Sequence, residues 1–149
     1  MRLVFLALSL AACTPAPAPA PTDAGCPVDL TMGADTADGG FAPIVDGQDL
    51  QIVMGPQGGF HVFVGVQAHG VPRTGVLEWS LTTTGGAPIG RRTLDLSSAF
   101  LDELDCGWER RQDALVFIDP ATVDQHRGQP AQLELKLGAL TRAARVIPR

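Results

Sequence analysis

The stretch Phe60–His69, which reads Phe-His-Val-Phe-Val-Gly-Val-Gln-Ala-His, decides the fold class because apolar and polar residues alternate along it. A period of two places successive side chains on opposite faces of a β-strand. The residues expected on the core face are Phe60, Val62, Val64, Val66 and Ala68. The residues expected on the other face are His61, Phe63, Gly65, Gln67 and His69. We therefore predict a strand with one face buried and the other more polar.

Similar runs of strand-forming residues follow one another along the chain, separated by Gly, Pro and Asp. Asp46-Gly47 predicts a hairpin between a strand at 44–45 and one at 49–54. Other strands are expected over residues 76–84, 89–96, 108–119, 130–138 and 142–147. Asp119 as N-cap, Pro120 at the first helical position and Gly128 after the last turn predict a short helix over 120–127.

Seven to eight short strands with one short helix predict an all-β protein, specifically an antiparallel β-sandwich. The order of these elements is similar to an immunoglobulin- or fibronectin-type domain. Two features depart from that pattern: the chain contains no Tyr, and Cys26 precedes the first strand, so Cys26, Trp79 and Cys106 lack the immunoglobulin spacing. A small barrel stays open as the alternative.

The N-terminus carries the signature of an exported protein. A basic start at Met1-Arg2 and an apolar stretch at Leu3–Leu10 form a short secretory signal. The sequence Leu10-Ala11-Ala12-Cys13 resembles the lipobox of bacterial lipoproteins. This resemblance implies removal of residues 1–12, lipidation of Cys13 and attachment to a membrane. Thr14 at the next position, where inner-membrane lipoproteins of Gram-negative bacteria tend to carry Asp, implies the outer membrane, facing the periplasm or the exterior.

Residues 14–25 are rich in Pro and Ala, a composition typical of an extended polyproline II segment. At about 3.1 Å per residue such a segment spans roughly 37 Å. We therefore divide the chain into a signal peptide (1–12), a lipidated Cys and tether (13–25) and a β-sandwich domain (26–149).

With Cys13 assigned to the lipid, Cys26 and Cys106 are left, and an even remainder in an exported chain predicts a disulfide. The chain has 11 basic and 16 acidic residues, a net charge of −5, and contains no basic cluster. This balance argues against nucleic acid as a partner.

Gly55-Pro56-Gln57-Gly58-Gly59-Phe60-His61-Val62 resembles a segment of exported lipoproteins in which a GPQGG turn precedes an aromatic-His strand. The resemblance implies the same fold and location and brings no activity with it.

The residues offer little catalytic or metal-binding chemistry. The sequence contains no GxSxG, HExxH, CxxC, P-loop or dinucleotide motif, and we expect neither an enzyme nor a cofactor. Met54 and His61 flank the GPQGG turn, and a thioether with an imidazole suits copper, which makes a periplasmic copper-binding protein the alternative function. Asp29, Asp35 and Asp38 raise calcium as a further possibility, but their spacing does not match an EF-hand.

His61, Phe63, Gln67 and His69 form the most informative candidate site, because an aromatic flanked by His and Gln on an exposed sheet face is a plausible contact patch. The alternative is that a loop covers this face. From these features we expect a lipid-anchored, non-catalytic binding or structural module. Its partners would be the membrane, through the lipid, and another envelope protein or polymer. An unrecognised hydrolase is the third hypothesis.

Overall fold

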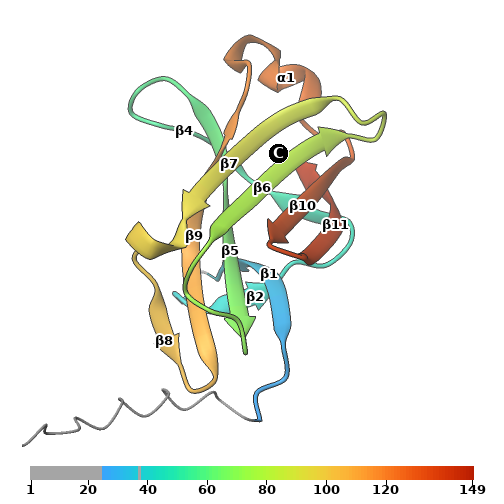
Figure 1. Ribbon diagram of the computed structural model, residues 1–149. Coiled ribbons are helices and arrows are strands. Elements are labelled where there is room, and N and C mark those ends of the chain that lie inside the picture. Colours follow the sequence, from blue (N-terminus) through green and yellow to red (C-terminus); the bar gives the residue numbers. More distant parts are fainter. Residues whose placement is uncertain (1–24, 37) are drawn as a thin grey trace, which may run out of the picture.

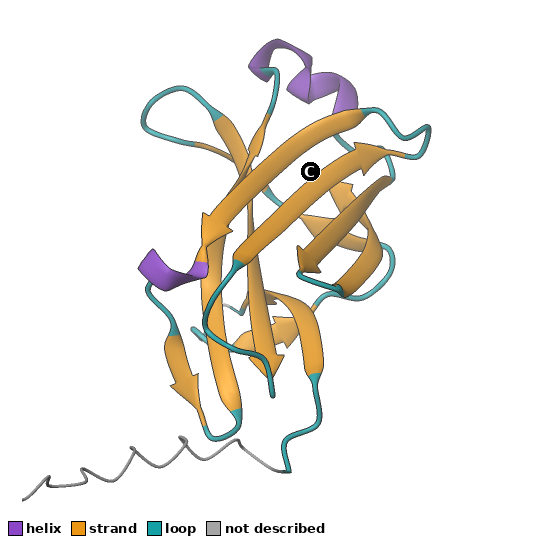
Figure 2. Ribbon diagram, viewed as in Figure 1, coloured by secondary structure: helices purple, strands orange, loops and turns teal. Residues whose placement is uncertain are grey.

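The computed structural model describes residues 25–36 and 38–149 (Figure 1). The predictions of a signal peptide (1–12), of lipidation at Cys13 and of a tether over 13–24 lie outside the described residues. The described chain is nearly all strand and turn, with a few short helical turns at its edges (Figure 2). The all-β prediction is therefore confirmed.

The strands and helices occupy most of the described sequence. The strands are β1 (Asp29–Asp35), β2 (Phe41–Pro43), β3 (Gln48–Leu50), β4 (Ile52–Met54), β5 (Phe60–His69), β6 (Val76–Thr83), β7 (Pro88–Asp95), β8 (Asp102–Leu104), β9 (Gly107–Phe117), β10 (Ala131–Leu137) and β11 (Leu140–Pro148). The helical elements are the 3₁₀ turns η1 (Leu96–Ser98) and η2 (Pro120–Thr122) and the one-turn helix α1 (Val123–His126).

The strands form one mixed sheet that curls into a half-barrel (Figure 1). Its order is β2-β1-β5-β9-β7-β6-β10-β11-β3, with β4 also paired to β5 and β8 to β9. The pairs are antiparallel except β3 with β11, which run parallel. The predicted count of seven to eight strands was too low, because four three-residue strands, β2, β3, β4 and β8, bring the described chain to eleven.

The predicted immunoglobulin-like sandwich requires two separate sheets, and the structure has one. Strands β7 and β9 join what would be the two layers through the pairs Gly90–Phe117 and Arg91–Val116. Gly90 permits this approach, since a Cβ there would lie 2.5 Å from Leu115 Cδ2. The sheet is therefore continuous around the core.

The hairpin predicted at Asp46-Gly47 is wrong. Strand β2 pairs with β1, and β3 pairs with β11. The turn is bound to β11 instead, because the Gly47 amide donates to the Arg145 carbonyl and the Asp46 carboxylate accepts from the Arg145 amide. The strands on either side of the Asp46-Gly47 turn therefore do not pair with each other.

Strand β5 confirms the alternation from which the fold was predicted. Val62, Val64, Val66 and Ala68 are fully buried, and they pack in a core that includes Trp79 and Trp108. Strand β9 runs beside β5 and carries a β-bulge where the register shifts between Val64 and Val66. Gly65 faces this bulge, and a Cβ there would lie 2.4 Å from the Arg111 carbonyl oxygen.

The predicted helix near residues 120–127 is present as the 3₁₀ turn η2 followed by α1, which end at His126. Asp119 caps its start by accepting a hydrogen bond from the Ala121 amide at 3.0 Å. Gly128 follows with a φ of +72°. This left-handed conformation commonly ends a helix, and glycine adopts it at little cost because it has no Cβ.

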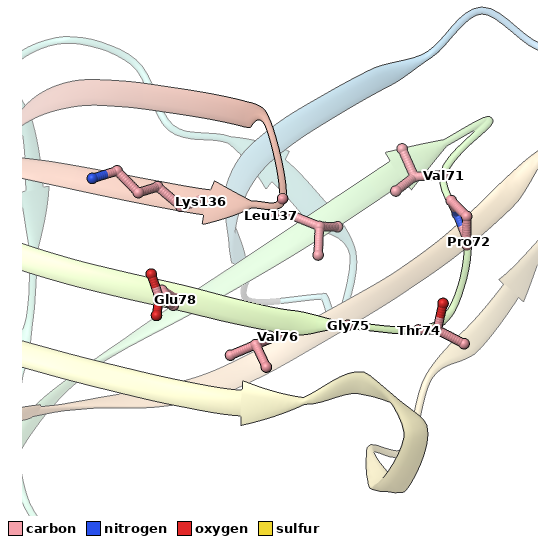
Figure 3. A pocket seen from close by; sticks show the side chains of 9 residues that line it. Val71, Pro72, Thr74, Gly75, Val76, Glu78, Lys136 and Leu137 are labelled. Atoms are coloured by element: carbon pink, nitrogen blue, oxygen red, sulfur yellow. The ribbon is translucent and has the colours of Figure 1, made fainter.

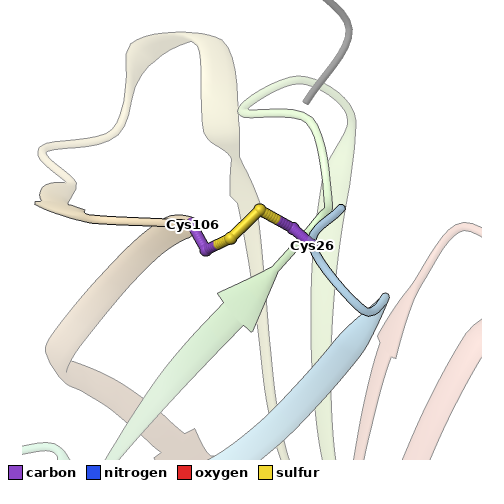
Figure 4. Close-up of a disulfide and its surroundings, with 2 residues drawn as sticks. All are labelled: Cys26 and Cys106. Atoms are coloured by element: carbon purple, nitrogen blue, oxygen red, sulfur yellow. A yellow bond between two sulfur atoms is a disulfide. The ribbon is translucent and has the colours of Figure 1, made fainter. Parts of the chain in front are cut away.

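The predicted disulfide between Cys26 and Cys106 is present, with Cα atoms 5.8 Å apart (Figure 4). It joins the segment leading into β1 to the turn between β8 and β9. The beginning of the described chain is thereby fixed to one end of the half-barrel.

Candidate functional site

The predicted patch on the polar face of β5 begins with a contact between two aromatic rings. The rings of His61 and Phe63 meet edge to face, with centroids 4.7 Å apart. Phe63 is 39% exposed, whereas its neighbours Val62 and Val64 are fully buried. The outward position of Phe63 is therefore as the alternation predicts.

Gln67 and His69 lie on the same face but farther along the strand. Four residues at about 3.3 Å each separate Phe63 from Gln67 by roughly 13 Å. The Gln67 side-chain amide donates to Glu109 Oε2 at 2.8 Å, and His69 lies between Asp29 on β1 and Gly107 on β9. The structure thus brings His61 and Phe63 together and leaves Gln67 and His69 in a separate polar region.

Two residues of β9 extend the exposed face beside the aromatic pair. Val116 is the cross-strand partner of His61, and Ala114 is the partner of Phe63. Val116 is 44% exposed. We call His61, Phe63, Ala114 and Val116 the aromatic patch. The run Ala114–Ile118 is apolar on both strand faces, and this pattern could have indicated the two residues.

The proposed copper ligands Met54 and His61 leave opposite faces of the β4–β5 pair. Met54 is paired with Phe60, and His61 is paired with Val53. Paired residues share a face and successive residues do not, so the two side chains point apart. This register does not favour Met54 and His61 as joint ligands.

The acidic residues considered for calcium are also dispersed. Asp29 and Asp35 stand at opposite ends of β1, and Asp29 accepts a hydrogen bond from Arg142. The Asp38 carboxylate accepts from the Thr36 hydroxyl. Within residues 25–36 and 38–149, no group of three or more His, Cys, Asp or Glu side chains is arranged to hold a metal ion.

Glu109 is a buried carboxylate on the same face as Gln67. Burial raises the pKa of Glu109, but hydrogen bonds from Gln67 and Arg111 and the Arg111 charge outweigh it, so this pKa lies below its usual value. The hydrogen bond and the charge of Glu109 in turn hold the pKa of Arg111 above its usual value. Glu109 is therefore a charged, firmly held structural group rather than a proton donor near neutral pH.

A second charged cluster, which the sequence did not reveal, lies on the core side of the sheet. Asp113 is 2% exposed and its Oδ1 accepts from Arg92 Nε at 3.1 Å and from Arg110 Nη2 at 3.5 Å. Arg110 also donates to the Phe100 carbonyl oxygen at 3.1 Å. We call Arg92, Arg110 and Asp113 the inner charge cluster.

The β-bulge creates the inner charge cluster. Arg110 is paired with Val66 and Asp113 with Val64, both core-facing positions. Residues three apart in a regular strand point to opposite faces, and the extra residue in the bulge returns Asp113 to the core side. Alternation counted from Trp108 places Asp113 on the outer face, whereas alternation counted from Leu115 places it on the core face, and this change of phase is the bulge.

The inner charge cluster and the neighbouring core contain buried polar atoms that are not fully paired. Asp113 Oδ2, Arg110 Nε and Trp79 Nε1 are buried and have no hydrogen-bond partner in the described part of the chain. Burying a charge without full pairing costs stability, so the cluster depends on its ion pairs. Its arrangement suits a structural role at the junction of β7 and β9.

An open cleft lies between the segment after β5 and the β10–β11 turn (Figure 3). Its volume is about 430 Å³. Val71, Val76 and Leu137 supply apolar walls, and Glu78 and Lys136 stand across from each other on β6 and β10. Lys136 forms its ion pair with Glu134 on the same strand, at 2.9 Å.

Comparisons of the chain with protein-family models, with curated proteins and with solved structures found no match. Among residues 25–36 and 38–149, no helix combines the length and the apolar character needed to cross a bilayer.

Proposed function

We propose that this chain is a lipid-anchored protein of the bacterial cell envelope whose β domain is a non-catalytic binding module. The domain would be held at the outer membrane through Cys13 and the Pro/Ala-rich segment, and would contact another envelope protein or an envelope polymer. The copper-binding alternative is less favoured, because Met54 and His61 point to opposite faces of the β4–β5 pair, and it is not developed further.

The observation that carries the binding role is the aromatic patch. Phe63 and Val116 are partly exposed on neighbouring strands, and the edge-to-face contact with His61 holds the Phe63 ring in a defined position. Aromatic residues held rigidly in an apolar surround are the usual anchors of protein interfaces. The lipobox resemblance at Leu10–Cys13 supports the location, and the sequence supplies no catalytic motif.

A cross-linking experiment tests the binding role. A photo-reactive phenylalanine at position 63 of the full-length protein should give a discrete cross-linked product in intact cells. The same probe at Val45, which is 63% exposed and not part of the patch, should not. Equal products from both positions, or none from either, would contradict the proposal.

Anchoring is tested separately through Cys13. The full-length protein should be found with the membrane fraction, and the Cys13→Ser variant should not, because lipid chains supply about 0.8 kcal/mol per buried methylene. Membrane association of Cys13→Ser equal to that of the wild type would overturn the lipid anchor and leave the patch experiment unaffected.

A further inference from the structure

An open cleft lies at the end of the half-barrel where the disulfide is. It has a volume of about 710 Å³, within the range of ligand-binding pockets. Its walls are the Gly70–Arg73 segment on one side and the Glu103–Trp108 segment on the other, with Cys26 and Val28 beside them. We call it the disulfide cleft. It is separate from the aromatic patch, with which it shares no residue.

Covalent and hydrogen bonds hold both walls of the disulfide cleft in place. The Cys26–Cys106 bond fixes the β8–β9 turn (Figure 4). The Trp108 indole N–H donates to the Val71 carbonyl at 3.0 Å, and the Gly70 amide donates to the Cys106 carbonyl at 2.9 Å. A cleft with rigid walls loses less entropy on binding than one that must be ordered by its ligand.

The charges of the disulfide cleft are unbalanced. Arg73 pairs with Glu103 at 3.2 Å. Asp105 also lines the cleft, is exposed, and has no ion-pair partner among the residues that the structure describes. One negative charge is therefore left over, which favours a cationic group in the cleft.

Apolar side chains line the same cleft as Asp105. Val28 is 61% exposed, and Leu104 and Pro72 line the cleft with it. A lysine or arginine side chain combines an aliphatic stem with a cationic end, so it suits an apolar wall beside a carboxylate.

We propose that the disulfide cleft binds an extended, basic and apolar segment of a partner protein. Its lysine or arginine stem lies over Val28 and its cationic end reaches Asp105. This assignment goes beyond the proposed function, because it adds a second contact surface and gives that surface a partner chemistry.

The two tryptophans provide the reporter and its internal control. Both tryptophans are buried, but Trp108 lies against the cleft and its indole N–H donates to Val71 in the cleft wall, whereas Trp79 does not line the cleft. In NMR spectra of the ¹⁵N-labelled full-length protein, a capped Leu-Lys-Leu peptide should shift the Trp108 indole resonance and leave that of Trp79 in place. The same peptide with norleucine in place of lysine should produce a much smaller shift.

Charge variants distinguish peptide binding in the disulfide cleft from binding in the other cleft, which Glu78 lines. Asp105→Asn should weaken peptide binding about threefold to fivefold, the range expected from one partly exposed ion pair. Glu78→Gln removes an equal charge from the other cleft and should leave the affinity unchanged. Both substitutions are at exposed positions, so each variant should keep the wild-type spectrum.

Three results would overturn the proposal. Trp108 could fail to respond to the lysine peptide, or the norleucine peptide could bind equally well. A free diamine such as 1,5-diaminopentane could also bind as tightly as the peptide, which would make the cleft a site for small amines. None of these results would bear on the aromatic patch.

Discussion

Asp113 links β7 and β9 through its ion pairs. Its carboxylate is 2% exposed and compensates two arginines, Arg92 and Arg110. Removing this carboxylate leaves Arg92 and Arg110, whose side chains are 39% and 21% exposed, without their counter-charge. The stability of the domain should therefore respond strongly to this one side chain.

We expect Asp113→Ala to lower the free energy of unfolding by about 1.5–3 kcal/mol, the range for lost hydrogen bonds to charged groups, because the two arginines left behind are partly exposed. Urea denaturation with tryptophan fluorescence measures the change. The matched control is Asp124→Ala, which removes a 90% exposed carboxylate paired with Arg127 and should cost under about 1 kcal/mol. Equal losses in the two variants would show that the inner charge cluster has no structural role.

Gly65 is required by the close approach of β9. A Cβ at this position would lie 2.4 Å from the Arg111 carbonyl oxygen, which belongs to the backbone and cannot rotate away. We expect Gly65→Ala to destabilise the protein by about 1–3 kcal/mol, the usual cost of overpacking. Gly59, where a Cβ meets nothing within 4 Å, is the control. A Gly65→Ala melting temperature no lower than that of Gly59→Ala would contradict the account of the bulge.

At the scale of elements, the disulfide acts on two structures together. It fixes the entry to β1 and the β8–β9 turn, and it forms part of the disulfide cleft. We expect the Cys26→Ser/Cys106→Ser double variant to lose about 2–5 kcal/mol of stability, as small exported domains do without a native disulfide. Calorimetry with and without a reducing agent measures this loss. Reductant should lower the wild-type melting temperature and leave that of the double variant unchanged.

An element could be predicted from the sequence where the interactions that form it are local, and not where they are long-range. Strand β5 and the Asp119-capped helix were predictable, since alternation and capping are properties of neighbouring residues. The hairpin at Asp46-Gly47 failed because three-residue strands such as β3 are held by distant partners, in this case β11. The single sheet was likewise hidden, because it depends on two residue pairs between β7 and β9.

In the candidate site, too, the local features could be predicted and the long-range ones could not. The outward position of Phe63 and its contact with His61 could be expected from the period-two pattern of one strand. Val116 and Ala114 complete the patch through cross-strand pairing, which one strand does not specify. Asp113 was not predicted, because its place on the core face follows from the bulge, where the alternation changes phase between Trp108 and Leu115.

At the scale of the whole molecule, an ion pair helps to hold the curled sheet together across its ends. Arg142 on β11 donates to Asp29 on β1 at 3.0 Å, although 113 residues separate them along the chain. The hydrogen bond from Arg142 is the main reason that the pKa of Asp29 lies below its usual value, with the Leu30 amide and Thr31 hydroxyl adding to it. The closure of the half-barrel is thus coupled to a titrating group.

The sign of this coupling predicts how stability depends on pH. A carboxylate whose pKa is lowered by folding stabilises the folded state above its unfolded pKa, about 3.9 for Asp, and that stabilisation is lost as the pH falls through the folded value. We expect Arg142→Gln to be less stable than the wild type at neutral pH, by under about 1 kcal/mol because the pair is partly exposed. The difference should shrink as the pH falls below about 4.

Urea denaturation of both proteins across this acid range measures the effect. Arg145→Gln serves as the control, since it removes the same charge from the same strand at a side chain that makes no ion pair in the described residues. The difference in free energy of unfolding between the wild type and Arg142→Gln could instead stay constant down to acid pH. In that case Asp29 would not help to hold β1 and β11 together. The half-barrel would then be held at this edge by packing alone, and its acid sensitivity would have to come from other carboxylates, Glu109 first among them, because its pKa is also held below the usual value.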